Sequence, residues 1–291
     1  MSWRLGLVDS AWFGSPWEGR AGFERAREIG FESVDLFIGY DPADLSSEQR
    51  RALRGEIEEA GLDPWALLCT PLGLADFNDS VRSFHIARAK RVLDLAGDVG
   101  AGSVMLCPGE YVFQGELLPR EWEWARLVGA VREIGEHAAA RRIEIAVELL
   151  PFRFAFINSL DSMVRLLDEV GLEGVTAAID ISHLWLQRIE PGEIARLRGR
   201  IGQVHIADCD GVHHGDLPAG TGTTPFVPYL VALRDAGYAG TASVELEFPP
   251  DPSLMLEWVT DAHRGALAVL EQAGLRGRRE VRYQERPGRA R

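Results

Sequence analysis

Four short apolar segments of this sequence each end in a carboxylate or an imidazole, and this recurrence limits the possible folds more than any other feature. The four terminal residues are separated by 32, 25 and 40 residues, each about the length of one strand and one helix. In a closed parallel barrel all strands point their carboxyl ends at one face, so four successive strand ends can converge on one point. The residues are Glu148, Asp180, His205 and Glu245.

The rest of the chain shows the same alternation of apolar strands and amphipathic helices. Strands are expected at 4–10, 33–38, 65–69, 103–107, 143–149, 175–180, 203–207 and 241–246. Helices are expected at about 18–29, 46–61 and 79–99. A further helix is expected to end near residue 140, and the remaining ones are expected at about 159–170, 191–197, 226–236 and 255–273. This order predicts a single (β/α)8 barrel over residues 1–275, followed by a basic tail at 276–291.

Three carboxylates and one imidazole form a ligand set that favours a divalent ion such as manganese or magnesium over a structural zinc, which favours cysteine. Each residue alone has a simpler explanation. His205 can be a core histidine, Glu148 and Glu245 can face water, and Asp180 can begin a helix as its N-cap. The recurrence on four successive strands favours a metal site.

Composition and charge exclude several classes of protein. The 291 residues are 46% hydrophobic and contain no apolar run long enough to cross a bilayer, so we expect no membrane association. The net charge of −13 disfavours nucleic acid as a partner, although the tail contains seven arginines. Three cysteines without a C-x-x-C pair predict free thiols, as in a reducing cytoplasm. The N-terminus resembles a strand and not a signal peptide, which also predicts a cytoplasmic protein. No glycine-rich nucleotide motif follows the first strand.

The motifs resemble those of the xylose-isomerase-like barrel superfamily, in particular its sugar isomerase and epimerase branch, which includes ketose 3-epimerases and inosose isomerases and dehydratases. The resemblance is carried by D-x-x-H at the sixth strand, H-I-x-D at the seventh, the LPAGTG loop and SVELE at the eighth. It implies one divalent metal, manganese foremost and otherwise magnesium, cobalt or zinc, bound by Glu148, Asp180, His205 and Glu245. It also implies that Glu148 and Glu245 exchange a proton of the substrate.

The same resemblance implies a keto-sugar or keto-cyclitol substrate that reacts through a metal-stabilised enediolate. His183 of D-x-x-H is then expected to hold a substrate oxygen. Further substrate contacts are expected from Asp208, Trp12, Glu110 and Trp185. We expect a homo-oligomer, and a hetero-oligomer stays open.

Two positions depart from the pattern of the ketose 3-epimerases. Gly211 stands where they carry an arginine, and Gly220-Thr221-Gly222 stands where Gly-Glu-Gly is frequent. Aromatic residues are expected partly at the rim of the pocket and partly in ordinary packing: Trp12, Phe13, Trp17, Phe152, Phe154, Phe156 and Trp185. A cyclic polyol or a sugar with an aromatic aglycone would suit such a rim.

Three alternatives to an epimerase stay open at this point. A lyase would use the same residues to expel a β-substituent, as in dehydration of a keto-inositol or elimination from a 3-keto-glycoside, possibly with a partner subunit. A phosphodiesterase of the same superfamily is disfavoured by the acidic chain, because phosphate backbones are repelled. A metal-binding scaffold subunit without activity is the third.

Overall fold

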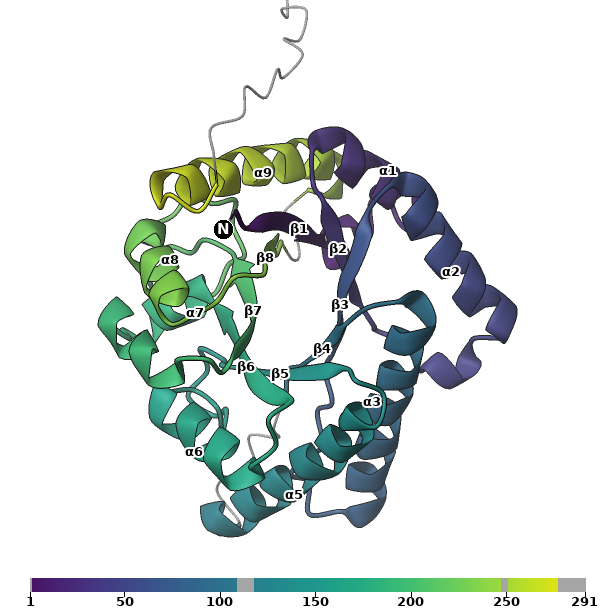
Figure 1. Cartoon of the computed structure of the whole chain (residues 1–291), viewed down its shortest axis with the longest axis vertical. Coiled ribbons are helices and arrows are strands. Elements are labelled where there is room, and N and C mark those ends of the chain that lie inside the picture. The colour runs from purple at the N-terminus through teal and green to yellow at the C-terminus, as the bar shows by residue number, and fades with distance from the viewer. Residues whose placement is uncertain (1, 109–117, 247–250, 277–291) are drawn as a thin grey trace, which may run out of the picture.

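The structure is a computed structural model that describes residues 2–108, 118–246 and 251–276. Eight parallel strands close into one barrel in sequence order, and the helices surround it (Figure 1). The strands are β1 (Arg4–Val8), β2 (Ser33–Phe37), β3 (Asp63–Cys69), β4 (Ser103–Leu106), β5 (Glu144–Glu148), β6 (Val175–Asp180), β7 (Ile201–Ile206) and β8 (Thr241–Val244). The predicted (β/α)8 barrel is confirmed.

The α-helices are α1 (Arg20–Ile29), α2 (Ser47–Ala60), α3 (Asp79–Val99), α5 (Arg120–Ala139), α6 (Leu160–Val170), α7 (Ile181–Leu186), α8 (Phe226–Asp235) and α9 (Met255–Gln272). Short 3-10 helices are η1 (Asp9–Trp12), η2 (Pro42–Asp44), η3 (Pro191–Leu197) and η4 (Pro252–Leu254). Local sequence sets several ends. Ser46 and Ser159 form capping boxes at the starts of α2 and α6, and left-handed glycines follow both helices.

Strand register brings the predicted ligands to one end of the barrel. Asp180 of β6 pairs with His205 of β7, and His205 pairs with Ser243 of β8. Glu148 ends β5, and Glu245 directly follows β8. Because parallel strands all end at the same face, these side chains are delivered to the carboxyl-terminal mouth of the barrel.

Two apolar clusters fill the fold. The larger one lies between the strands and the helices and includes residues from nearly every element. A smaller, separate cluster consists of one residue from each of five strands, namely Val8, Leu68, Met105, Ala146 and Ala178. The residues next to them along the strands belong mostly to the larger cluster. This alternation places the small cluster inside the barrel, directly under the mouth.

Some elements differ from the sequence prediction. The segment 191–197 is the 3-10 helix η3, and the short helix α7, which the prediction did not assign as a helix, follows β6 immediately. Arg276, assigned to the tail, donates to Glu32 Oε2 at 2.6 Å, while residues 277–291 lie outside the described residues. Within the described parts, no helix has both the length and the apolar character that a membrane span requires.

Close packing inside the barrel can be tested at Gly6 of β1. A methyl group there would lie 2.6 Å from Ser243 Oγ and 2.7 Å from Ser33 Oγ. We expect Gly6→Ala to lower the free energy of unfolding by about 1–3 kcal/mol, because a filled interior must shift to accept it. Gly97→Ala in α3 is the control, since its added methyl would meet only Ile143 Cδ1 at 3.9 Å and alanine favours the helix by about 1 kcal/mol. Urea unfolding of both variants measures the difference; equal stability would contradict this packing.

Candidate functional site

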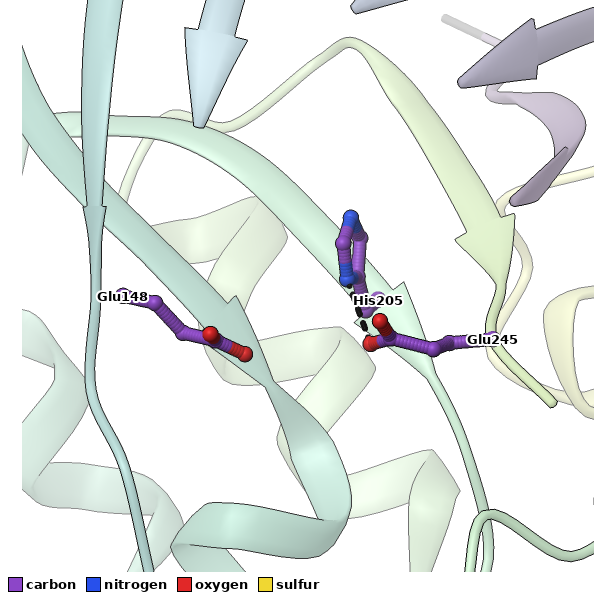
Figure 2. Close-up of side chains that lie close together, drawn as sticks. All are labelled: Glu148, His205 and Glu245. Carbon is purple, nitrogen blue, oxygen red and sulfur yellow. Dashed lines mark hydrogen bonds and ion pairs between the residues drawn. The ribbon is translucent and has the colours of Figure 1, made fainter. Parts of the chain in front are cut away.

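Three buried side chains from three strand ends point toward one another at the mouth of the barrel (Figure 2). They are Glu148 at the end of β5, His205 near the end of β7 and Glu245 directly after β8. One potential ligand atom from each lies within 4.8 Å of those of the other two. His205 Nδ1 donates to Glu245 Oε2 at 2.8 Å. The site therefore brings together three of the four predicted metal ligands.

Asp180, the fourth predicted ligand, lies outside this group of mutually close atoms but at the same end of the barrel. Its Oδ1 accepts hydrogen bonds from the backbone N–H groups of Ser182 and His183 and so caps α7. Its Oδ2 is buried and has no hydrogen-bond partner within residues 2–108, 118–246 and 251–276. The N-cap explanation is therefore correct for one oxygen, while the other oxygen is available to a ligand.

Burial and mutual charge shift the protonation of the cluster. Burial, together with the charge of Glu245, raises the pKa of Glu148 from 4.5 to about 8. Burial also raises the pKa of Asp180. His205 is buried too, which lowers its pKa, but the charges of Glu245 and Asp35 outweigh this and raise the pKa well above 6.5. In the absence of a bound cation, these buried groups can stay close together because some of them keep their protons.

The donors of this cluster fit a divalent cation. Carboxylate oxygens with one imidazole nitrogen are suitable ligands for manganese, magnesium, cobalt and zinc. The buried Oδ2 of Asp180 has no hydrogen-bond partner among the residues that the structure describes, and such an atom is costly unless something else satisfies it. A bound cation would satisfy it and would displace the protons held by Glu148 and His205.

Asp35 of β2 is a second buried carboxylate beside the cluster that the sequence analysis did not identify. Its exposed fraction is 1%, neither of its oxygens has a hydrogen-bond partner in the described ranges of the chain, and Oδ2 lies 3.7 Å from His205 Nε2. His205 is therefore flanked by Glu245 on Nδ1 and by Asp35 on Nε2. The acidic residue in SVDLF was visible in the sequence, but it lies in the middle of a strand and not at its end.

The hydrogen bonds of His183 determine its tautomer. Nδ1 lies 2.8 Å from the carbonyl oxygen of Leu149, which can only accept, so Nδ1 carries the proton. Burial, with the nearby His214, lowers the pKa of His183 to about 3, so the ring is neutral and Nε2 is an acceptor. His214 Nε2 lies 2.8 Å from this atom and therefore donates to it, while Asp216 Oδ1 lies 3.3 Å from the same nitrogen of His214.

A cavity of about 300 Å³ opens over the cluster. Its wall contains both polar and apolar residues, and the described lining residues include neither lysine nor arginine. The polar lining residues are Thr70, Cys107, Glu148, His183, His214, Asp216 and Glu245, and the apolar ones are Phe37, Leu68, Met105, Leu150 and Phe152. Such a surface suits a small polyhydroxylated molecule, which has hydroxyl groups and apolar C–H faces.

The structure assigns Asp208 a different role from the predicted substrate contact. Its carboxylate is fully buried and accepts from the backbone N–H groups of Cys209, Gly220, Gly222 and Thr224 at 2.8–3.0 Å. Asp208 therefore holds the loop after β7 in place. A Cβ atom at Gly222 would lie 2.5 Å from Asp208 Oδ1, so the hydrogen bonds of Asp208 to this loop require glycine at position 222.

Two other predicted contacts, Trp12 and Trp185, are also not among the described residues that line the cavity. Trp12 is 2% exposed and belongs to the large apolar core, where it packs over Gly22. Trp185 donates from Nε1 to Thr223 Oγ1 at 3.0 Å and stacks with Arg188. Glu110 lies outside the described residues. Of the aromatic residues expected at the rim, Phe152 lines the cavity, whereas Phe156 is buried.

The loop after β7 also explains the absence of an arginine at Gly211. This glycine has φ +84°, and a Cβ atom would lie 2.8 Å from Thr223 Oγ1 and 3.3 Å from Trp185 Nε1. No larger side chain fits there without moving the loop. His214, three residues later, faces the cavity instead, whereas its neighbour His213 is exposed and bonded to Asp210.

A family model described as xylose isomerase-like TIM barrel matches residues 23–270. The D-psicose 3-epimerase of Ruminiclostridium cellulolyticum is 25% identical over 173 residues, which are 58% of this chain and 56% of that protein. The alignment thus spans little more than half of that relative. The L-ribulose-5-phosphate 3-epimerase UlaE of Salmonella paratyphi C is 23% identical over 233 residues, which are 76% of this chain and 79% of that protein.

Solved structures show the same fold. A structure of L-ribulose 3-epimerase matches with a TM-score of 0.79 and 22% identity over 94% of this chain and 96% of that one. The structure of an IOLI protein with a bound zinc atom matches with a TM-score of 0.81 and 17% identity over 93% of this chain and 99% of that one.

The raised pKa of Glu148 makes the stability of the metal-free protein depend on pH. The protonated carboxyl is favoured in the folded state, so its contribution is complete below pH 4.5 and is lost as the pH rises through about 8. Glu148→Gln retains the neutral form at every pH. We therefore expect the variant to become increasingly more stable than the parent between pH 5 and 8, measured by urea unfolding with chelator present. Parallel curves for the two proteins would contradict the assignment.

The two roles of Asp180 can be separated by substitution. Asparagine can still cap α7 through its side-chain oxygen but has no negative charge. We expect Asp180→Asn to change the stability of the metal-free protein by less than about 1 kcal/mol and to weaken Mg²⁺ or Co²⁺ binding about tenfold or more, measured by titration calorimetry. Asn78→Ala, which removes the cap of α3, is the converse control: it should cost about 1 kcal/mol of stability and leave metal affinity unchanged. Unchanged metal affinity in Asp180→Asn would leave Asp180 with the capping role alone.

Proposed function

Because the chain belongs to the xylose isomerase-like TIM barrel family, we propose that it is a divalent-metal-dependent sugar isomerase or epimerase. The observation that carries this proposal is the pair Glu148 and Glu245, two buried carboxylates that face the same small cavity from β5 and from the end of β8. The relatives act on ketoses by name, as psicose and ribulose-phosphate 3-epimerases. The proposed substrate is accordingly a keto-sugar or keto-cyclitol.

Glu148, His205 and Glu245, with Asp180 Oδ2, are proposed to hold the ion. Manganese is the first candidate, and magnesium, cobalt and zinc also suit these ligands; the related IOLI structure contains zinc. A bound divalent ion supplies positive charge that makes the proton next to a substrate carbonyl more acidic. The remaining chemistry belongs to side chains of this chain.

Proton transfer is assigned to the two glutamates. One carboxylate removes the α-proton, the substrate passes through an enediolate, and the opposite carboxyl returns a proton. Glu148 and Glu245 face the cavity from different strands, so one can act as the base while the other supplies the returning proton. His183 is neutral with Nε2 as an acceptor, and a substrate hydroxyl that takes the place of His214 as donor would bind there.

A lyase is the second candidate, favoured by one observation. The loop after β7 leaves no room for a side chain at Gly211, so this chain lacks the arginine expected in a ketose 3-epimerase. The same enediolate can expel a substituent on the neighbouring carbon. The product decides between the two: an epimerase returns an isomer, whereas a lyase releases water or an alcohol.

Deuterium exchange tests the proposed chemistry. The magnesium- or cobalt-loaded protein is incubated in deuterated water with ketoses, keto-inositols and 3-keto-glycosides and followed by proton NMR. We expect deuterium at a carbon next to the carbonyl. In Glu245→Gln we expect exchange to fall at least about 100-fold, because general acid–base groups contribute 10²–10⁴-fold.

Glu144→Gln is the matched control, since Glu144 begins β5 at the opposite end of the barrel. It should exchange at the parental rate. Metal content and thermal unfolding are measured for both variants, so that loss of metal or fold is recognised. Parental exchange in metal-loaded Glu245→Gln would remove this residue from the mechanism, and absence of exchange across the panel would remove the proposed reaction.

A further inference from the structure

Two phenylalanines lie exposed beside the cavity, on the loop between β5 and α6. Phe152 is 36% exposed and Phe154 is 46% exposed, and their rings are parallel, with centroids 5.4 Å apart. Phe152 also lines the cavity, and its ring centroid lies 5.7 Å from that of His214. The pair therefore extends the apolar part of the cavity wall outward into solvent.

The loop that carries these rings is held by its own hydrogen bonds. Leu150 N–H donates to the carbonyl of Ile157 at 2.8 Å, and Ala155 N–H donates to that of Phe152 at 3.1 Å. The Asn158 side-chain amide also donates to the Phe152 carbonyl at 3.2 Å. Ala155, Phe156 and Ile157 supply the apolar contacts of this loop with the core. The two exposed rings are thus presented by a fixed backbone and are not required to anchor the loop.

The size of the cavity places the rings outside the space that a sugar fills. About 300 Å³ lies at the lower end of the range for small-molecule sites, which is enough for one monosaccharide. A substituent on the far end of that sugar must leave the cavity through the mouth. Phe152 lies at that boundary and Phe154 continues the aromatic surface beyond it.

Charge disfavours a phosphate as this substituent. The cavity lining contains Glu148, Glu245 and Asp216, and its described residues include no lysine or arginine. Arg153, between the two phenylalanines, is exposed and is not a lining residue. A phosphate carries a charge of about −1.5 to −2 at pH 7 and is normally paired with basic groups or helix N-termini.

We infer that the cavity takes an unphosphorylated keto-sugar whose non-reacting end carries an apolar or aromatic group, and that Phe152 and Phe154 bind this group. Aromatic rings stack on such groups and also exclude water from them. The inference rests on the proposed function only in taking a keto-sugar as the part that fills the cavity. It adds a second binding site, next to the reacting one.

Binding is measured by calorimetry on the magnesium-loaded protein with three probes: the methyl glycoside of 3-keto-glucose, its phenyl analogue, and the 6-phosphate of the methyl glycoside. We expect the phenyl glycoside to bind about tenfold more tightly than the methyl glycoside, because the added ring is partly buried on the phenylalanines. We expect the 6-phosphate to bind at least about tenfold more weakly. Equal affinities for methyl and phenyl glycosides, or tighter binding of the phosphate, would overturn the inference.

The double variant Phe152→Ala/Phe154→Ala tests which residues are responsible. It should reduce the phenyl preference, read as the ratio of methyl to phenyl dissociation constants, to about one. Phe84→Ala is the matched control, because Phe84 is 53% exposed on α3 and is not a lining residue. If the double variant fails to fold, Phe154→Ala alone is used, and it should lose part of the preference. A phenyl preference that survives these substitutions would refute the assignment to this pair.

These measurements distinguish failure of the inference from failure of the proposed reaction. Binding is read without turnover, so tight phenyl binding without deuterium exchange would refute the reaction and leave the aromatic site intact. Exchange of free ketoses without a phenyl preference would do the opposite. If no probe binds to metal-loaded protein, the inference is wrong, whatever the free ketoses show.

Discussion

Three carboxylates buried together at one end of the barrel are the constraint on which the site depends. Glu148, Asp180 and Glu245 each lose hydration, and their charges repel one another. The protein offsets part of this cost with His205, which pairs with Glu245, and with the amino terminus of α7, which donates two N–H groups to Asp180. Oδ2 of Asp180 has no hydrogen-bond partner among the described residues, and we propose that a divalent cation satisfies it.

The barrel can place these charged side chains together because its rigid strands position them at the carboxyl-terminal end. The loops at that end are fixed by separate hydrogen bonds. In the loop after β7, Asp208 turns its carboxylate to four backbone N–H groups and takes no part in the cavity. In the loop after β5, backbone hydrogen bonds and Asn158 hold Phe152. Binding and proton transfer are therefore assigned to different elements, and loop sequence can change substrate choice without disturbing the carboxylates.

The part of this organisation that depends on periodicity could be predicted from sequence. Strand alternation and helix signals predicted the barrel, and strand ends predicted which residues gather at its mouth. Side-chain direction in the loops could not be predicted in this way, because it depends on backbone hydrogen bonds between positions with no fixed spacing. Asp208 and Trp12 were expected to contact substrate and instead hold a loop and the core, whereas His214, which belongs to none of the motifs, faces the cavity. Asp35 was overlooked because it lies in the middle of a strand.

The lack of space for a side chain at Gly211 affects how this cavity can select a substrate. An arginine is always charged and favours anionic or strongly polarised oxygens. Here the backbone at Gly211 closes against Thr223 and Trp185, and the nearest basic group facing the cavity from this loop is His214, whose Nε2 is directed at His183 and Asp216. The described lining residues include no permanent cation, so an anionic substituent forms no ion pair with them. Substrate selection then depends on the positions of the substrate hydroxyl groups and on the aromatic surface of Phe152 and Phe154. Proton transfer by the glutamates is then compatible with a neutral, bulky sugar as well as with a small ketose.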